Sequence, residues 1–203
     1  MRQAVVGRAA SRNATLVRVG APSGTVTFLF TDVEGSTRLW ELAPSAMGIA
    51  MARHDELVRS AVQARGGYVF STGGDGFAAA FARAGDAIAA AVGAQSALAE
   101  EPWPADAAIG VRMGLHTGEV EERDGNYFGS AVNRAARLMA LAHGGQVVAS
   151  AATADVAADA VPPGVKLTDL GEHPCVICPA VSTSSRWRPR DSARSSRCFV
   201  RSM

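Results

Sequence analysis

Short apolar runs alternate along this chain with longer stretches in which apolar residues recur at helical spacing. Thr25 to Thr31 is a continuous run of β-forming residues and predicts a strand buried on both faces. Apolar positions at helical spacing then continue as far as Gly66-Gly67, where paired glycines end a helix. Tyr68 to Ser71 and Phe77 to Phe81 predict two strands joined by a tight glycine-rich turn.

The second half of the chain continues the alternation. Ala84 to Leu98 is rich in alanine and predicts a helix, Ile109 to Thr117 predicts a strand, and Gly129 to His143 predicts a second long helix. Glu119 to Asn126 is expected to be a polar excursion between them. Three shorter elements follow: a strand at Gln146 to Ala149, a helix at Ala151 to Ala160 and a strand at Val165 to Leu170. This order predicts an α+β fold, with a ferredoxin-like βαββαβ core and additional C-terminal α/β elements.

Length and charge divide the chain into one domain with two basic ends. The chain has 203 residues with 48% hydrophobic and 19% charged positions, which is enough for one globular α/β domain. Residues 1–24 contain four arginines and no acid, and predict a flexible basic leader. The domain is expected at residues 25–172. Residues 173–203 form an irregular tail, rich in Arg and Ser, that we expect to lie outside the fold.

The same features limit the partners and the location. Arg/Ser-rich ends are more often solvated than bound to nucleic acid, so no nucleic-acid partner is predicted. No stretch approaches the apolar length of a membrane span, and the leader lacks the uninterrupted apolar segment of a secretory signal. All three cysteines lie at or beyond Cys175, so the body has no disulfide framework. We therefore expect a cytoplasmic protein without a membrane partner.

Two acids stand where the predicted strands end or turn. Asp32 follows directly after the first strand, and Asp75 lies in the hairpin turn. In a split βαβ fold these segments are neighbours, so both carboxylates are expected at one end of the sheet. Carboxylates suit Mg²⁺ or Mn²⁺ bound with a nucleotide, and the carbonyl of Val33 would add another oxygen ligand. Taken singly, each acid is better explained as a helix cap or a turn residue.

Three blocks of sequence carry a resemblance to a known family. They are FLFTDVEGST, STGGDGFAAAF and VRMGLHTGEV followed by GNYFGSAVNRAARLM. In order and spacing they resemble the motif blocks of class III nucleotidyl cyclase catalytic domains, the adenylyl and guanylyl cyclases, of the bacterial or mycobacterial type. The resemblance covers about residues 24–172 and implies the palm-like fold of these enzymes. It also implies conversion of ATP, or GTP, to the 3′,5′-cyclic nucleotide and pyrophosphate.

The resemblance assigns roles to particular residues. Asp32 and Asp75 would hold two Mg²⁺ or Mn²⁺ ions per site, together with Val33. Asn133 and Arg137 lie four residues apart on one helical face and would orient the ribose and stabilise charge at the α-phosphate. In this family the aspartates and the Asn/Arg pair come from different chains, which implies a head-to-tail homodimer with two symmetric sites. The substrate-binding residues expected beside the metal ligands, where a glycine lets the backbone approach phosphate, are Val33, Gly35, Ser36 and Thr37.

The positions that read the base depart from the family pattern. Adenylyl cyclases carry a Lys four residues before the second metal aspartate and an Asp seven residues before the helix Asn, and these positions hold Ser71 and Asn126 here. Both side chains donate and accept hydrogen bonds, so they discriminate poorly between ATP and GTP. The Glu/Cys-type pair of guanylyl cyclases is also absent, and we expect ATP as the substrate.

The C-terminus departs further and leaves alternatives open. After LTDLGEH the family continues with a basic strand and a cation for the terminal phosphates, whereas this chain continues PCVICPAVSTSSRWRPR. We hypothesise a frameshifted tail, which sequencing the gene would test. A catalytically weak or dead cyclase-homology module, which binds nucleotide or only dimerises, is therefore the main alternative. A diguanylate cyclase is less favoured, because that family needs an acid after the turn Asp, where Gly76 stands.

Overall fold

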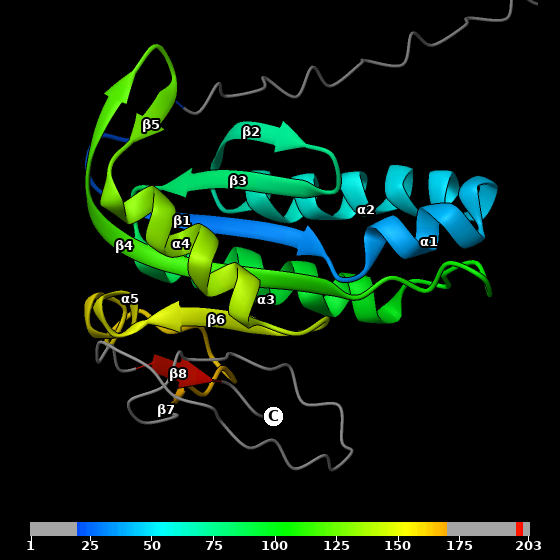
Figure 1. The fold of residues 1–203 in the computed structure, drawn as a ribbon. Helices are drawn as coiled ribbons and strands as arrows, with labels where there is room; N and C mark the ends of the chain where they lie inside the picture. The colour runs from blue at the N-terminus through cyan, green and yellow to red at the C-terminus, as the bar shows by residue number, and fades with distance from the viewer. Residues whose placement is uncertain (1–19, 170–197, 201–203) are drawn as a thin grey trace, which may run out of the picture.

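The computed structural model describes residues 20–169 and 198–200 and places eight strands in one sheet. The order is β2-β3-β1-β4-β6-β8-β7, with β5 paired to β4 (Figure 1). The strands are β1 Gly24–Val33, β2 Tyr68–Gly73, β3 Gly76–Phe81, β4 Val111–Arg123, β5 Asn126–Phe128, β6 Val147–Ser150, β7 Thr168–Asp169 and β8 Cys198–Val200. The helices are α1 Ser36–Leu42, α2 Pro44–Ala64, α3 Ala84–Glu100, α4 Ser130–Leu141 and α5 Ala151–Val156.

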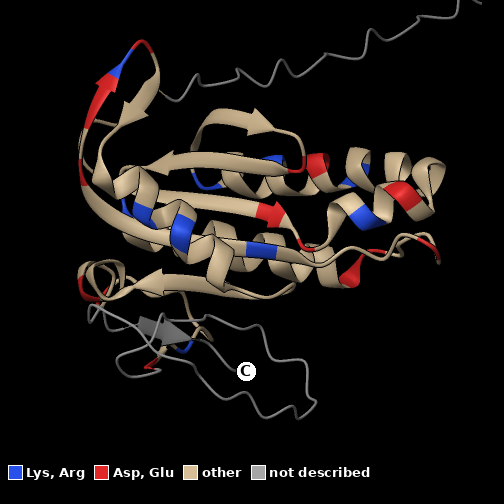
Figure 2. Ribbon diagram, in the orientation of Figure 1, with Lys and Arg blue, Asp and Glu red and all other residues tan. Residues whose placement is uncertain are grey.

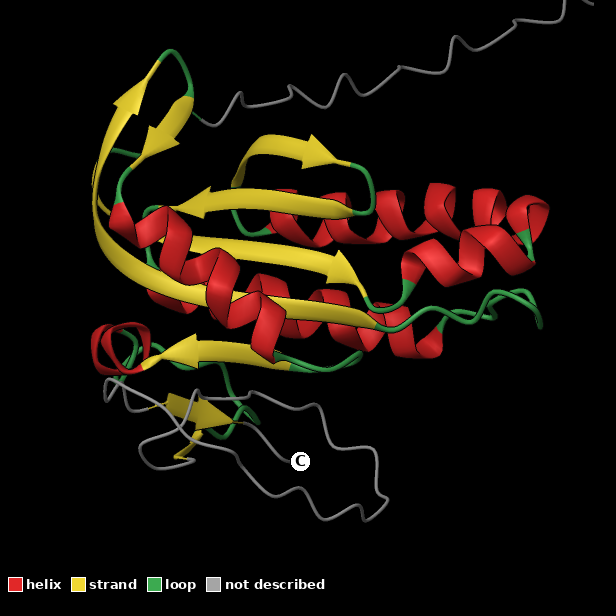
Figure 3. Cartoon of the chain, viewed as in Figure 1, coloured by secondary structure: helices red, strands yellow, loops and turns green. Residues whose placement is uncertain are grey.

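Helices cover both faces of the sheet, but one face carries more of them than the other. Helices α2 and α3 lie on one face, whereas α4 lies on the other (Figures 1 and 3). Successive side chains of β1 point to opposite faces of the sheet and pack against different helices. Leu29 and Val33 belong to the core cluster that includes residues of α2 and α3. Phe28 points to the other face and packs with Ala131 and Ala135 of α4. β1 is therefore buried on both faces, as its continuous apolar run predicts.

The predicted α+β class and the core order are confirmed. The central pairs are antiparallel β1 with β3 and with β4, and β4 runs parallel to β6. Two element boundaries are corrected. The helix expected to reach Ala160 ends at Val156, and the strand expected from Val165 begins only at Thr168. The strand is described as far as Asp169, and Leu170 lies outside the described residues. None of the helices in the described part of the chain has the length and apolar character needed to cross a bilayer.

The segment Glu119 to Asn126 is not a loop excursion, so that prediction is wrong. β4 continues through it as far as Arg123, turns at Asp124 and Gly125, and pairs with β5 through Glu121 and Phe128. The extension curves away from the sheet (Figure 1). One face of the extension, with Glu119, Glu121 and Arg123, is exposed, and the other, with Val120 and Glu122, is half-buried. Because Val120 is its only apolar residue, the sequence shows no alternation of apolar and polar positions by which a half-buried strand is recognised.

Three residues of the tail join the sheet. β8 pairs antiparallel with both β6 and β7, through Phe199 opposite Ala149 and Val200 opposite Thr168. The sequence pattern predicts no strand there. Residues 1–19, 170–197 and 201–203 lie outside the described residues, so the basic leader, the tail and its hypothesised frameshift stay predictions.

Candidate active site

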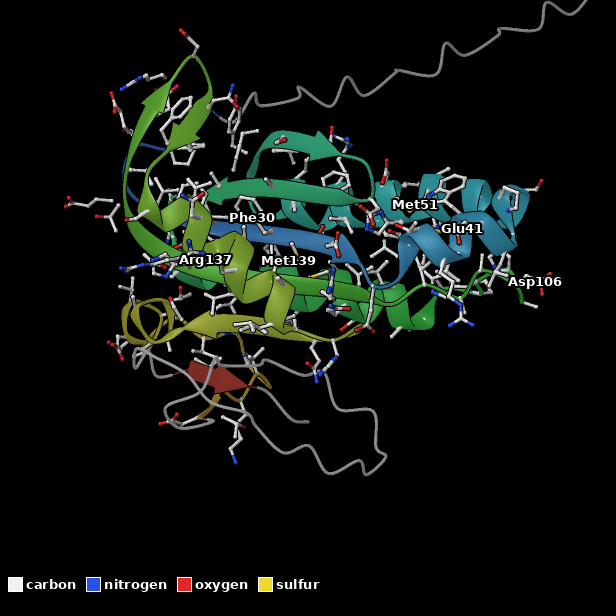
Figure 4. All side chains as sticks on the ribbon, in the orientation of Figure 1. Phe30, Glu41, Met51, Asp106, Arg137 and Met139 are labelled. Carbon is white, nitrogen blue, oxygen red and sulfur yellow. The ribbon has the colours of Figure 1, made fainter. Side chains whose placement is uncertain are left out.

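Asp32 lies at the end of β1, on the face of the sheet that carries α4. It lies on the same face of the strand as Phe28 and Phe30, and Figure 4 shows Phe30 on the face where α4 lies. The Asp32 side chain is 23% exposed. Among the described residues its carboxylate accepts side-chain hydrogen bonds only from Arg112 and none from an N–H of α1, so it does not cap that helix. The helix-cap explanation of this acid therefore fails.

Asp75 is brought to the same edge of the sheet by the β1–β3 register. Phe30 pairs with Ala78, so the ladder continues toward Asp32 beside Gly76. A Cβ on Gly76 would lie 2.3 Å from the carbonyl oxygen of Thr31 and 3.7 Å from Cα of Asp32. The N–H of Phe77 also donates to Oγ1 of Thr31, at 3.0 Å. Asp75 directly precedes this close contact, so the structure brings the two predicted metal ligands to one end of the sheet.

The carbonyl of Val33 is directed toward the same region by the hydrogen-bond ladder. The N–H of Glu34 donates to the carbonyl of Gly110 at 2.9 Å, which makes Glu34 and Gly110 a hydrogen-bonded pair. The neighbouring antiparallel pair, Val33 and Val111, is then of the non-hydrogen-bonded kind. Main-chain groups of Val33 therefore face the β3 side, where the turn with Asp75 lies.

The donor set fits a hard divalent cation. It consists of two carboxylates and a peptide carbonyl, all oxygen ligands of the kind that Mg²⁺ and Mn²⁺ use. Within the described residues there is no cluster of three or more His, Cys, Asp or Glu side chains that could hold a metal. A site with two carboxylates leaves coordination positions for water and for phosphate oxygens, which is typical of magnesium sites that bind nucleotides.

Arg112 also belongs to this region, and the sequence reasoning missed it. It lies directly opposite Asp32 in the β1–β4 ladder. Its Nε donates to Oδ2 of Asp32 at 3.0 Å, and its Nη2 donates to the same oxygen. Figure 2 shows the basic position on β4 beside the acidic tip of β1. One signal could have revealed it, because Arg112 is the only Asp, Glu, Lys or Arg of the predicted strand Ile109 to Thr117.

The loop after β1 is held by its backbone and by Glu34. Gly35 has a φ of 69°, in the left-handed region, so the turn into α1 favours glycine. Oε2 of Glu34 accepts a hydrogen bond from the N–H of Gly144 at 3.1 Å, which ties the loop to the segment after α4. Ser36 and Thr37 begin α1, beside the end of β1. The predicted substrate-binding residues therefore adjoin the predicted metal ligands.

Helix α4 presents Asn133 and Arg137 to solvent. Its buried side consists of Ala131, Ala135 and Leu138, and it approaches β4 closely at Gly114. A Cβ on Gly114 would lie 2.3 Å from the N of Met139 and 2.6 Å from the carbonyl oxygen of Ala135. Figure 4 shows Arg137 on this helix. Among the described residues, Asn133 and Arg137 make no side-chain hydrogen bond or ion pair, and one chain alone does not join them to Asp32 or Asp75.

Ser71 and Asn126 are both exposed, on β2 and β5. An aromatic cluster that the sequence reasoning also missed links their two strands. The ring centroid of Phe70 lies 4.9 Å from that of Tyr127, and the Phe28 and Tyr127 centroids are 5.1 Å apart. Burial is the main cause that raises the pKa of Tyr127, whose hydroxyl donates to the carbonyl of Pro22 at 2.7 Å. The cluster fixes the β4–β5 hairpin against β2.

His116 lies on β4 and is packed. Its Nδ1 is 2.7 Å from Oγ of Ser150, and burial, with a smaller contribution from the charge of Arg134, lowers its pKa to about 4. A neutral imidazole is therefore favoured at physiological pH. Its position under α4, 6% exposed, is that of a structural residue.

Comparison with protein families gives one match. The family model described as "Adenylate and Guanylate cyclase catalytic domain" matches residues 19–174. An uncharacterised protein of Mycobacterium tuberculosis is 48% identical over 155 residues, covering 75% of this chain and 52% of its own length. An adenylate cyclase of Podospora anserina is 35% identical over 179 residues, covering 74% of this chain and 8% of that protein. This chain thus spans about half the length of the mycobacterial relative.

Solved structures have the same fold. An adenylate/guanylate cyclase/hydrolase from Silicibacter pomeroyi superposes with a TM-score of 0.67 at 29% identity, covering 86% of this chain and 94% of that one. An adenylate cyclase from Trypanosoma brucei, solved in its monomeric state, gives a TM-score of 0.68 at 23% identity, covering 87% and 88% of the two chains. The expected palm-like fold is therefore confirmed.

Proposed function

Because this chain belongs to the adenylate and guanylate cyclase catalytic-domain family, we propose that it converts ATP, and less readily GTP, to the 3′,5′-cyclic nucleotide and pyrophosphate. The observation that carries the proposal is the convergence of Asp32, Asp75 and the Val33 carbonyl at one end of the sheet. In the reaction the ribose 3′-oxygen forms a bond to the α-phosphorus. The bond between the α-phosphorus and the oxygen that bridges it to the β-phosphorus breaks, so pyrophosphate leaves, and the 3′-hydroxyl proton passes to water.

The residues of this chain bind and orient the substrate. Asp32 and Asp75, with the Val33 carbonyl, would hold Mg²⁺ or Mn²⁺, two per site. When bound, these ions lower the pKa of the 3′-hydroxyl and neutralise triphosphate charge. The backbone at Gly35, with Ser36 and Thr37, lies beside these ligands and would bind the phosphates.

We assign Asn133 and Arg137 to the site of a second copy of the chain. Both side chains are exposed and make no polar side-chain contact within the described residues, which supports a role that a partner completes. In a head-to-tail homodimer each would reach the metal-ligand end of the other chain and form two symmetric sites. An Arg fork there would stabilise the charge that develops on the α-phosphate, and Asn would orient the ribose.

Ser71 and Asn126 are proposed to contact the base. Both are exposed and uncharged, and either can donate or accept a hydrogen bond. Such a pair can form hydrogen bonds with the edge of either adenine or guanine. A charged residue would be left buried and unpaired against the wrong base, and this pair imposes no such penalty. We therefore expect modest discrimination in favour of ATP.

A second candidate is a cyclase-homology module that binds nucleotide or dimerises without turnover. The observation that favours it is the ion pair of Asp32 with Arg112, which leaves the first metal ligand already neutralised. Incubating the purified protein with Mn²⁺ and either ATP or GTP distinguishes the candidates. We expect low but measurable cyclic AMP, higher with Mn²⁺ than with Mg²⁺. Retained nucleotide binding without cyclic AMP, cyclic GMP or cyclic di-GMP would identify the module instead.

A further inference from the structure

The ion pair between Asp32 and Arg112 differs from the other carboxylate pairs of arginine in the described part of the chain. Its side chains are 23% and 27% exposed, and in no other such pair are both partners less than a third exposed. By contrast, Arg123 and Glu121 are 62% and 60% exposed. Water screens exposed pairs strongly, so the Asp32–Arg112 pair is the one whose attraction is best preserved.

Both donors of Arg112 use the same oxygen of Asp32. Nε and Nη2 each donate to Oδ2, so that oxygen is occupied by the guanidinium fork. A divalent cation that binds Asp32 would compete with Arg112 for the same negative charge. The two cations would also repel each other at this distance, so binding of one weakens binding of the other.

Within the described residues Arg112 has no second ion-pair partner. The residues two positions before and after it are glycines: Gly110, just before β4, packs against the backbone of Gly144, and Gly114 packs against the backbone of α4. The nearest acid along the chain from Asp32 is Glu34, which accepts from the N–H of Gly144 and lies 3.5 Å from Nδ1 of His143. Among the described residues, Asp32 is therefore the single ion-pair partner of Arg112.

We propose that Arg112 is an internal counter-ion that competes with the divalent cation for Asp32. In the metal-free protein it holds the carboxylate in place and removes the cost of a bare charge at the strand end. When a cation binds, this pair must open or weaken, so Arg112 lowers the metal affinity of the protein without nucleotide. Arg112 acts on the metal through Asp32 and is in this respect a positioning residue. The inference rests on the proposed function, because it requires Asp32 to be a metal ligand.

Mn²⁺ binding to the full chain without nucleotide tests the proposal, since free Mn²⁺ is measured directly by electron paramagnetic resonance. We expect Arg112→Met to bind Mn²⁺ about tenfold more tightly than the wild type, since the cation then no longer competes with a partly buried ion pair. Its thermal unfolding midpoint without metal should fall, and the rise on adding Mn²⁺ should be larger than for the wild type. Arg112→Lys, which keeps the charge but loses the fork, should lie between the two.

Two further variants separate the possible failures. Arg53→Met also removes a paired arginine, bonded to Glu56 and Glu101, and should leave Mn²⁺ affinity unchanged. Asp32→Asn, which removes a proposed metal ligand, should lose Mn²⁺ binding. Should Asp32→Asn bind Mn²⁺ as the wild type does, the metal site itself is wrong and the inference fails with it. If Asp32→Asn loses binding while Arg112→Met and Arg112→Lys gain none, or gain no more than Arg53→Met, only the counter-ion proposal is overturned. Arg112→Lys keeps the test decisive if Arg112→Met does not fold.

Discussion

The end of β1 and the outer face of α4 carry the two halves of the proposed site, and they differ in how far one chain completes them. At the end of β1, Asp32 is partly buried and paired with Arg112, and Gly76 places the turn with Asp75 against the strand. On α4, Asn133 and Arg137 are exposed and make no side-chain hydrogen bond or ion pair in the described part of the chain. The first half is therefore fixed by the folding of one chain, whereas the second would be completed only in the proposed dimer.

The largest effect should come from breaking each half separately. Asp32→Ala and Arg137→Ala should each lower cyclic AMP formation by about a thousandfold or more, because the first removes a metal ligand and the second the cation for developing charge. Mixing the two inactive variants should restore about a quarter of wild-type activity, since about half of the dimers are mixed and each has one intact site. Activity is measured after subunit exchange has been verified by native mass spectrometry.

The mixing experiment has a matched control. Asp32→Ala mixed with Asp75→Ala should stay inactive, because both changes then fall in the same half of the site. Recovery in that mixture, or none in the first one despite exchange, would contradict the division of the site between two chains.

The inner side of α4 should be sensitive to any added side-chain volume. Gly114→Val should lower the free energy of unfolding by about 2–4 kcal/mol, because the new Cβ would overlap backbone atoms of Ala135 and Met139 that cannot move independently. Urea unfolding measures the change. Gly93→Ala is the control: its Cβ would meet nothing within 4 Å in α3, so it should be neutral or stabilise by up to about 1 kcal/mol. A Gly114→Val variant as stable as Gly93→Ala would show that α4 is not packed this closely against β4.

Stability should fall in acid because of His116. Its folded-state pKa, about 4, lies below the unfolded value of 6.5, so the unfolded chain binds the extra proton first. This contribution is present in full above pH 6.5 and is lost as the pH falls toward 4. Between pH 7 and pH 5 it should cost about 2 kcal/mol, measured as urea midpoints at several pH values. His116→Gln should show a correspondingly weaker dependence, and an unchanged slope would exclude His116 as the cause.

The smallest effect should fall on the outer side of α4. Arg137→Ala should change the free energy of unfolding by less than about 0.5 kcal/mol, because the side chain is exposed and makes no ion pair among the described residues. Urea unfolding of the monomer, diluted below its association limit, measures this. A loss of more than about 1 kcal/mol there would mean that Arg137 supports the fold of its own chain. The loss of activity in Arg137→Ala could then be explained by loss of stability.

Several features could be read from the sequence because they depend on local pattern. The continuous run before Asp32, the glycine-rich turn with Asp75 and the four-residue spacing of Asn133 and Arg137 predict their strand, hairpin and helical face. The structure confirms these elements. The extension of β4 beyond Thr117 could not be predicted, because its half-buried face carries only one apolar side chain, Val120, and a single position shows no alternation.

The sequence by itself determined the α+β class, the order of the core elements and the two acids at the ends of their strands, because hydrophobic periodicity and turn residues act over a few positions. Only the tertiary structure decided that Arg112 lies opposite Asp32, that α4 packs closely against Gly114 and that β8 pairs with β6. Those contacts join residues far apart along the chain, and their partners follow from strand register and close packing, which no local pattern encodes.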